Sequence, residues 1–104
     1  MSTRIFFLSR LRDGASRDEY ERWVHEVDLP VIRAIPTVLG YEVVRLDGPW
    51  RDGDVPYDYV ESIEVSDPDL YRRQLEAIPD REGFSAAWRR LVGETVAVFG
   101  TAVE

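Results

Sequence analysis

Two residues whose side chains exchange protons readily, Asp28 and His25, stand three positions apart in the segment 23–28. Side chains at this spacing lie next to each other on a helix surface. A carboxylate beside an imidazole raises the imidazole pKa, and such pairs serve in general acid–base sites. The spacing therefore favours proton-transfer chemistry at Asp28, with His25 assisting.

Asp28 also interrupts the apolar pattern of its predicted helix. With Val24 at 0° and about 100° per residue, the apolar stripe consists of Val24, Tyr20, Val27, Val31 and Ile35. Asp28 falls at about 40°, inside the stripe, and His25 at about 100°, on its shoulder. A buried, unpaired carboxylate is costly unless it takes up a proton. The structural alternative is that Asp28 binds a local main-chain amide or Arg33, while His25 is solvated.

A second misplaced charge is Glu61, in the predicted strand 57–65. Alternate residues of a strand share one face, and Glu61 is the charged member of an apolar and aromatic row. The pattern leaves open which face of the sheet the helices cover. A bound aromatic molecule would lie between the sheet and the helix that carries Asp28 and His25. The residues we expect to contact it are Glu61, Tyr41, Tyr59, Tyr20 and Arg45. The alternative is a structural pair between Glu61 and an arginine across the sheet.

The sequence offers little for a cofactor or a metal ion. Cysteine is absent and His25 is the single histidine, which excludes disulfides, thiol nucleophiles and zinc–thiolate sites. It has no glycine-rich phosphate loop and no nucleophile elbow. We expect no cofactor and no metal, with a carboxylate-only metal site as the alternative.

Local signals delimit the elements that position these residues. Ser16 and Glu19 form a capping box before the first helix, and Pro36 follows its end. Asp67 and Pro68 open the second helix. The predicted strands are 4–11, 38–46, 57–65 and 94–103, and the predicted helices are 17–34, 68–78 and 82–92.

This order predicts one α+β domain over residues 1–104, a ferredoxin-like βαββαβ plait. Its four-stranded antiparallel sheet carries the helices on one face. The last two strands are apolar on both faces, since Val60 opposes Tyr59 and Val98 opposes Phe99. Because the helices suffice for only one face, we expect a second copy to cover the other. The result would be a homodimer, a dimeric α+β barrel.

Composition narrows the classes of partner. The 104 residues carry a formal net charge of -7 and no basic run, which argues against nucleic acids and anionic membrane surfaces. Aromatic residues make up 12%, enough to fill a core or line a pocket for a small flat molecule. The first residues are too short an apolar run for a signal peptide, and no stretch suffices to span a bilayer. We expect a cytoplasmic protein.

Three segments resemble a known family. They are Arg4-Ile-Phe-Phe-Leu-Ser-Arg-Leu11, Asp18-Glu-Tyr-Glu-Arg-Trp-Val-His-Glu-Val-Asp-Leu-Pro30 and Arg33-Ala-Ile-Pro-Thr-Val-Leu-Gly-Tyr41. Together they resemble the RedY-like proteins of the dimeric α+β barrel superfamily. Related barrels carry a histidine two residues before the helix proline, where this sequence has Asp28. The departure puts histidine-based chemistry in doubt and points to Asp28 a second time.

The resemblance implies a small protein of bacterial secondary metabolism that tailors or cyclises an aromatic intermediate, indole- or pyrrole-derived, without a cofactor. The favoured hypothesis is a cyclase, dehydratase or isomerase in which Asp28, assisted by His25, moves a proton. A second hypothesis is a cofactor-free monooxygenase of an electron-rich phenol or anthrone. A third is a non-catalytic binding protein or chaperone for a reactive intermediate.

Overall fold

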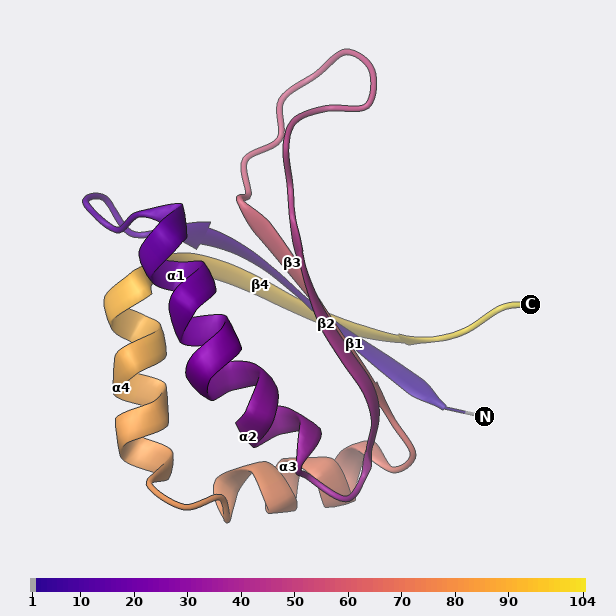
Figure 1. Cartoon of the computed structure of the whole chain (residues 1–104). Coiled ribbons are helices and arrows are strands. Elements are labelled where there is room, and N and C mark those ends of the chain that lie inside the picture. The colour runs from indigo at the N-terminus through magenta and orange to yellow at the C-terminus, as the bar shows by residue number, and fades with distance from the viewer. Residues whose placement is uncertain (1) are drawn as a thin grey trace.

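The computed structural model describes residues 2–104, in which four strands and a set of helices follow the predicted order (Figure 1). The strands are β1 (Thr3–Leu11), β2 (Val38–Arg45), β3 (Tyr59–Val65) and β4 (Val92–Thr101). The helical elements are α1 (Arg17–Trp23), a π-helical turn (Val24–Asp28), α2 (Leu29–Arg33), α3 (Pro68–Glu76) and α4 (Arg81–Leu91). Within residues 2–104, no helix combines the length and the apolar character needed to cross a membrane.

The four strands form one antiparallel sheet in the order β2-β3-β1-β4, with the helices on one face (Figure 1). This arrangement confirms the predicted ferredoxin-like plait. The first residues of two strands, β3 and β4, differ from the prediction by two positions. Strand β3 begins at Tyr59 rather than at residue 57, because Asp58 binds β1 instead: its amide donates to the Ser9 carbonyl and its carboxylate accepts from the Leu11 amide. Strand β4 begins at Val92, directly after α4.

The first helical segment runs without a break from Arg17 to Arg33, but it widens into a π-helical turn before Pro30. The Leu29 amide donates to the Val24 carbonyl, five residues back. Proline has no amide hydrogen, and its ring crowds the carbonyl four residues before it. A wider turn gives that ring room, and such turns are frequent at functional sites.

The π-helical turn corrects the predicted buried stripe. In a regular α-helix, residues four apart drift by about 40° per step, which is why the prediction placed Val27 and Val31 in the stripe. The wider turn winds less per residue and offsets this drift. The buried row is therefore Tyr20, Val24, Asp28 and Ile32, whereas Val27 and Val31 are only half-buried.

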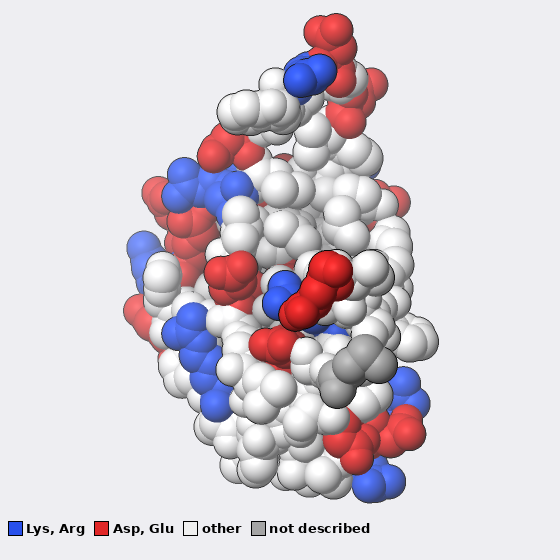
Figure 2. All heavy atoms as spheres, turned by 90° about the vertical axis from the view of Figure 1, so that its right-hand side faces the viewer, with Lys and Arg blue, Asp and Glu red and all other residues white. Residues whose placement is uncertain are grey.

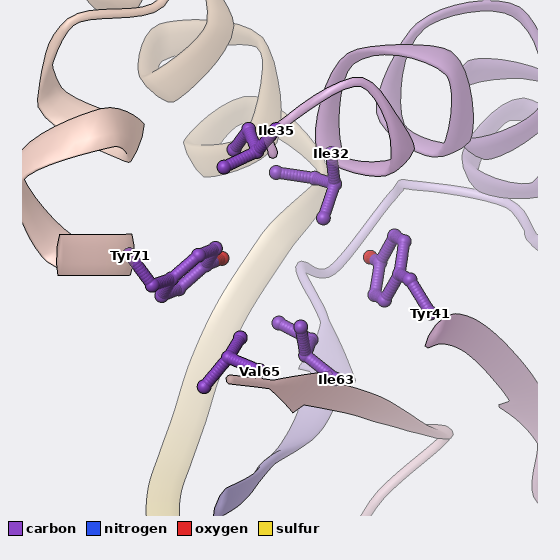
Figure 3. Close-up of a cluster of buried hydrophobic side chains, with 6 residues drawn as sticks. All are labelled: Ile32, Ile35, Tyr41, Ile63, Val65 and Tyr71. Carbon is purple, nitrogen blue, oxygen red and sulfur yellow. The ribbon is translucent and has the colours of Figure 1, made fainter. Parts of the chain in front are cut away.

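The helices cover the sheet face that carries Tyr59, Glu61, Ile63 and Val65 of β3, all of them buried. The pairing register sets Glu61 level with Phe7 of β1 and with Val43 of β2. One core cluster lies between α2, α3 and the sheet (Figure 3) and contains Ile32, Ile35, Tyr41, Ile63, Val65 and Tyr71. A second contains Tyr20, Val24, Tyr59 and Val92.

The other face of the sheet has no helix over it. Its exposed apolar side chains include Val44, Val96 and Val98, each about half accessible to solvent. Figure 2 shows this face as largely uncharged across its upper middle, with acidic and basic side chains gathered below and at the tip of the loop above. Both faces of the sheet thus carry apolar side chains, as the sequence indicated.

Candidate functional site

A cavity of about 210 Å³ lies between the sheet and the helices, and both misplaced carboxyl groups line it. Asp28 comes from the π-helical turn and Glu61 from the middle of β3. The remaining lining residues are Phe7, Ile32, Tyr41, Ile63, Tyr71, Leu75, Arg81, Phe84, Ser85, Trp88 and Arg89. Two carboxyl groups therefore share one mainly apolar space, an arrangement typical of a proton-transfer site.

Asp28 is 3% exposed, and its carboxyl group accepts a hydrogen bond from the Tyr41 hydroxyl of β2. Burial raises the pKa of Asp28 to about 6, although the bond from Tyr41 lowers it in part. Neither structural alternative for Asp28 is realised. Its side chain makes no helix-capping bond, and Arg33 donates instead to the Tyr41 main-chain oxygen at 2.9 and 3.2 Å.

Glu61 is 6% exposed, and the Tyr20 hydroxyl donates to its Oε1 at 2.8 Å. Burial raises the pKa of Glu61 to about 7, and the nearby Asp28 charge raises it further, while bonds from Tyr20 and Trp88 act in the opposite direction. Within residues 2–104, no arginine forms an ion pair with Glu61. The structural alternative of a Glu61–arginine pair is therefore not realised.

The tyrosines of the cavity act as hydrogen-bond donors. Burial raises the pKa of both Tyr20 and Tyr41 far above the ordinary value, so each keeps its proton for a carboxyl group. In Figure 3 the hydroxyl groups of Tyr41 and Tyr71 point toward one another, with Ile32 on one side and Ile63 on the other. Burial raises the pKa of Tyr71 to about 12, so this hydroxyl also stays protonated.

Sequence reasoning missed the part of the site that α3 and α4 supply. None of the predicted site residues lies on either of these two helices. On α4, the cavity residues are Arg81, Phe84, Ser85, Trp88 and Arg89, all on one helical face. That periodicity was visible in the sequence, but nothing there showed that the face borders an open space rather than a filled core.

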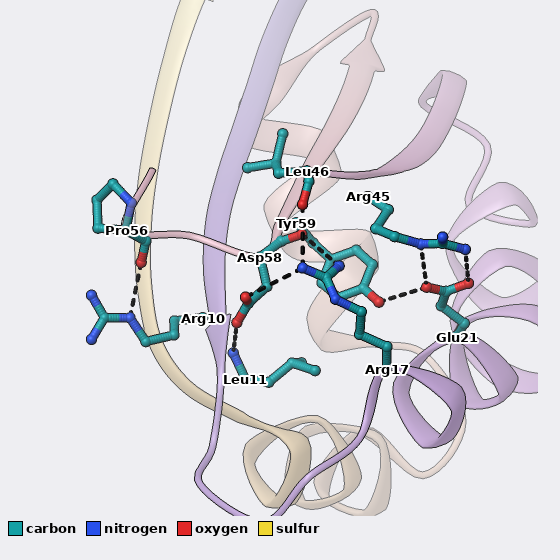
Figure 4. Close-up of polar contacts among 9 residues, drawn as sticks. All are labelled: Arg10, Leu11, Arg17, Glu21, Arg45, Leu46, Pro56, Asp58 and Tyr59. Atoms are coloured by element: carbon teal, nitrogen blue, oxygen red, sulfur yellow. Dashed lines mark hydrogen bonds and ion pairs between the residues drawn. The ribbon is translucent and has the colours of Figure 1, made fainter. Parts of the chain in front are cut away.

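The other predicted site residues lie in a separate hollow of about 240 Å³, which His25, Arg45 and Tyr59 line together with Glu21. Arg45 donates twice to the Glu21 carboxylate, at 2.8 and 2.9 Å, and the Tyr59 hydroxyl donates at 2.6 Å (Figure 4). These bonds, from Arg45 first, hold the pKa of Glu21 below its usual range. This cluster ties α1 to the edge of the sheet.

The expected pairing of His25 with Asp28 is not made. His25 is exposed, and within residues 2–104 no hydrogen bond or ion pair joins its ring to Asp28. Because the buried row passes through Val24 and Asp28, the next position along the helix turns away from the cavity. His25 thus shares its side of the helix with Glu21, four residues earlier.

Within residues 2–104, no three carboxylate, histidine or cysteine side chains converge as a metal ion would require. Each of the two carboxyl groups in the cavity accepts a hydrogen bond from a tyrosine. Tyr20 and Tyr41, both among the predicted site residues, are the donors.

Comparison with known proteins identifies a family for nearly the whole chain. The family model described as REDY-like protein HapK matches residues 3–103. The chain belongs to the REDY-like HapK family. Its resemblance to RedY-like proteins is thereby confirmed. No curated protein sequence matched the chain.

Solved structures place this HapK-family chain among ferredoxin-like proteins. HapK from Hahella chejuensis is 30% identical, with a TM-score of 0.73, covering 99% of this chain and 93% of that one. A dimeric ferredoxin-like protein of unknown function from Thermobifida fusca is 24% identical, with a TM-score of 0.74 and coverage of 98% and 92%. SnoaB, a cofactor-independent oxygenase from Streptomyces nogalater, is 22% identical, with a TM-score of 0.71 and coverage of 99% and 93%. The last two likenesses show the fold alone.

Proposed function

We propose that this HapK-family protein is a cofactor-independent tailoring enzyme of the cyclase, dehydratase or isomerase type. It acts by general acid–base chemistry on an aromatic, indole- or pyrrole-derived intermediate of bacterial natural-product biosynthesis, in the cytoplasm. One observation carries the proposal: Asp28 and Glu61 line the same apolar cavity, and burial raises the pKa values of these groups to about 6 and about 7.

Burial raises the pKa values of both carboxyl groups toward neutral pH, so the pair can share one proton there. In the proposed reaction Glu61 holds this proton and Asp28 is ionised. Glu61 then protonates a ring carbon of the substrate as general acid, and ionised Asp28 removes a proton from the resulting cation as general base. The proton gained by Asp28 returns to Glu61 through solvent, so that the net change is an isomerisation or ring closure of the substrate.

The tyrosines position these two carboxyl groups. Tyr41 holds Asp28 from β2 and Tyr20 holds Glu61 from α1, and both tyrosines remain protonated throughout the reaction. The volume of the cavity, about 210 Å³, fits one ring or two fused rings, since an apolar cavity of about 150 Å³ accepts benzene.

The same proposal includes a homodimer of single-domain subunits. The apolar outer face of the sheet, with Val44, Val96 and Val98 exposed, supports coverage by a second copy. The relative from Thermobifida fusca is described as dimeric. Two such sheets facing each other would make the dimeric α+β barrel.

Hydrogen–deuterium exchange at carbon 3 of indole in D₂O, followed by ¹H NMR, tests the proposal. Exchange requires protonation of the ring carbon followed by loss of a proton, the two steps assigned to Glu61 and Asp28. We expect the protein to accelerate exchange and Asp28→Asn or Glu61→Gln to reduce the acceleration about 100-fold. Both amides keep an oxygen that accepts the tyrosine bond. Glu64→Gln, three residues from Glu61 but pointing away from the cavity, should match the wild type.

Two results would overturn this assignment. Saturable indole binding without accelerated exchange would favour the non-catalytic binding protein or chaperone. Consumption of molecular oxygen with an electron-rich phenol or anthrone, retained in Asp28→Asn, would favour a cofactor-free monooxygenase, the activity named for SnoaB.

A further inference from the structure

Two arginines stand at the edge of the cavity, on the face of α4 that borders it. Arg81 is half-buried and Arg89 is exposed, whereas Asp28 and Glu61 are buried deep inside. Arg81, Ser85 and Arg89 follow one another at four-residue spacing, which places them in one row along the helix. Arg81 donates to the Ser85 hydroxyl, so its guanidinium reaches along the row toward Arg89.

Neither guanidinium has an acidic partner among residues 2–104. The three ion pairs in residues 2–104 use Arg10, Arg17 and Arg45. The charge of Arg81 instead acts on a neutral phenol, because it lowers the pKa of Tyr71, against the larger effect of burial. Burial, hydrogen bonds and, for Glu61, the nearby Asp28 charge set the pKa values of the two carboxyl groups. Positive charge therefore gathers at the entrance and proton-transfer groups at the interior.

Apolar side chains line the part of the cavity between the two arginines and the two carboxyl groups. Phe84 and Trp88 lie on the same face of α4 as Arg81, and Ile32 and Ile63 line the cavity as well. Aromatic side chains pack favourably against an aromatic ligand. A guanidinium matches a carboxylate in charge and in its two-pronged geometry. An anion deeper in the cavity would meet ionised Asp28, which repels it, so charge favours a carboxylate at the arginine end.

We propose that the cavity takes a small aromatic carboxylic acid, with its carboxylate on Arg81 at the entrance and its ring against Phe84 and Trp88. Arg89 adds a second positive charge at the same end. The reacting edge of the ring then faces Asp28 and Glu61. This inference rests on the proposed function, because it names the substrate class of the same site, but its test measures binding rather than turnover.

Isothermal titration with two probes of nearly equal shape tests the inference: indole-2-carboxylic acid and its neutral amide, indole-2-carboxamide. At pH 7.5 we expect the acid to bind about tenfold more tightly than the amide. Arg81→Gln should abolish this preference and Arg89→Gln should reduce it. Arg81→Lys, which keeps the charge but loses the planar fork, should restore part of it. Arg90→Gln is the matched control, since Arg90 lies on the same helix but borders a different hollow.

Equal dissociation constants for acid and amide would overturn the inference. A preference for the acid that survives in Arg81→Gln would do the same, provided that circular dichroism shows a folded variant. The binding test and the exchange test can fail independently of each other. If the acid binds in a way that depends on Arg81 but indole shows no carbon-3 exchange, only the acid–base proposal is contradicted. If exchange depends on Asp28 but the protein does not prefer the acid, only the carboxylate subsite is contradicted.

Discussion

The Tyr41 hydroxyl donates to the Asp28 carboxyl group and thereby joins strand β2 to the π-helical turn at the wall of the cavity. The bond stabilises the ionised form of Asp28, whereas burial favours the neutral form. The balance of these two effects holds the pKa of Asp28 near 6. Strand β2 supplies the hydrogen bond and the π-helical turn supplies the buried position, and both shift the pKa of the Asp28 carboxyl group.

Tyr41→Phe should therefore raise the pKa of Asp28 above about 6, because burial remains and the stabilising bond is lost. The titration of the side-chain carboxyl carbon by ¹³C NMR measures this directly. Tyr57→Phe, just before β3 and outside the cavity, is the control and should leave the titration unchanged. An unaltered or lowered Asp28 pKa in Tyr41→Phe would show that the bond does not govern this group.

Folding stability should depend on pH through the same two carboxyl groups. Their pKa values in the folded state, about 6 for Asp28 and about 7 for Glu61, exceed the ordinary values of 3.8 and 4.5. Between about pH 4 and pH 7 the folded state therefore binds more protons than the unfolded state, and the free energy of unfolding falls as the pH rises. The loss should be on the order of 3 kcal/mol for each group.

Urea denaturation at pH 4.5, 6 and 8 checks this dependence. Asp28→Asn and Glu61→Gln should each flatten the decline, so that either variant gains stability relative to the wild type as the pH rises. Glu64→Gln, whose side chain does not line the cavity, should follow the wild type. Parallel stability curves for wild type and Asp28→Asn would contradict the raised Asp28 pKa.

His25 should contribute little to catalysis despite its place in the sequence, three residues before Asp28. Its ring is exposed and lines the hollow of Glu21, Arg45 and Tyr59. His25→Gln should retain carbon-3 exchange of indole within about twofold of the wild type, since no contact transmits the change to Asp28. A loss comparable with that of Asp28→Asn would mean that His25 reaches the reacting atoms during turnover.

The outer face of the sheet should determine the oligomeric state. Val96, on β4, is 42% exposed on this face. Val96→Asp places a charge where a second copy is expected to pack and should convert a dimer into a monomer, because an unpaired buried charge is costly. Light scattering coupled to size-exclusion chromatography measures the mass. Val55→Asp, in the loop before β3, is the control, and a monomeric wild-type protein would refute the dimer.

Several features of this protein follow from local sequence alone. The capping box at Ser16 and Glu19 forms as predicted, and Asp67 caps α3, because capping bonds join residues only a few positions apart. Asp28 and Glu61 stood out because each breaks a periodic apolar pattern. Both are buried in the structure, and both line the same cavity.

The π-helical turn lay beyond what periodicity indicates. A regular helix predicts Val27 and Val31 in the buried stripe, but the wider turn before Pro30 brings Ile32 inward instead. The number of residues per turn depends on how this helix packs over the sheet as well as on the proline itself. A fixed angle of about 100° per residue could not anticipate it.

The partners of each carboxyl group were decided by tertiary structure. The sequence singled out Asp28 and Glu61, yet it suggested His25 and an arginine as their partners, whereas Tyr41 and Tyr20 fill those roles. Sequence periodicity predicts which side of a helix or strand a residue occupies. Only the packing of helix on sheet states which residue of another element lies opposite, because contacts between distant segments depend on register and on the space the side chains leave.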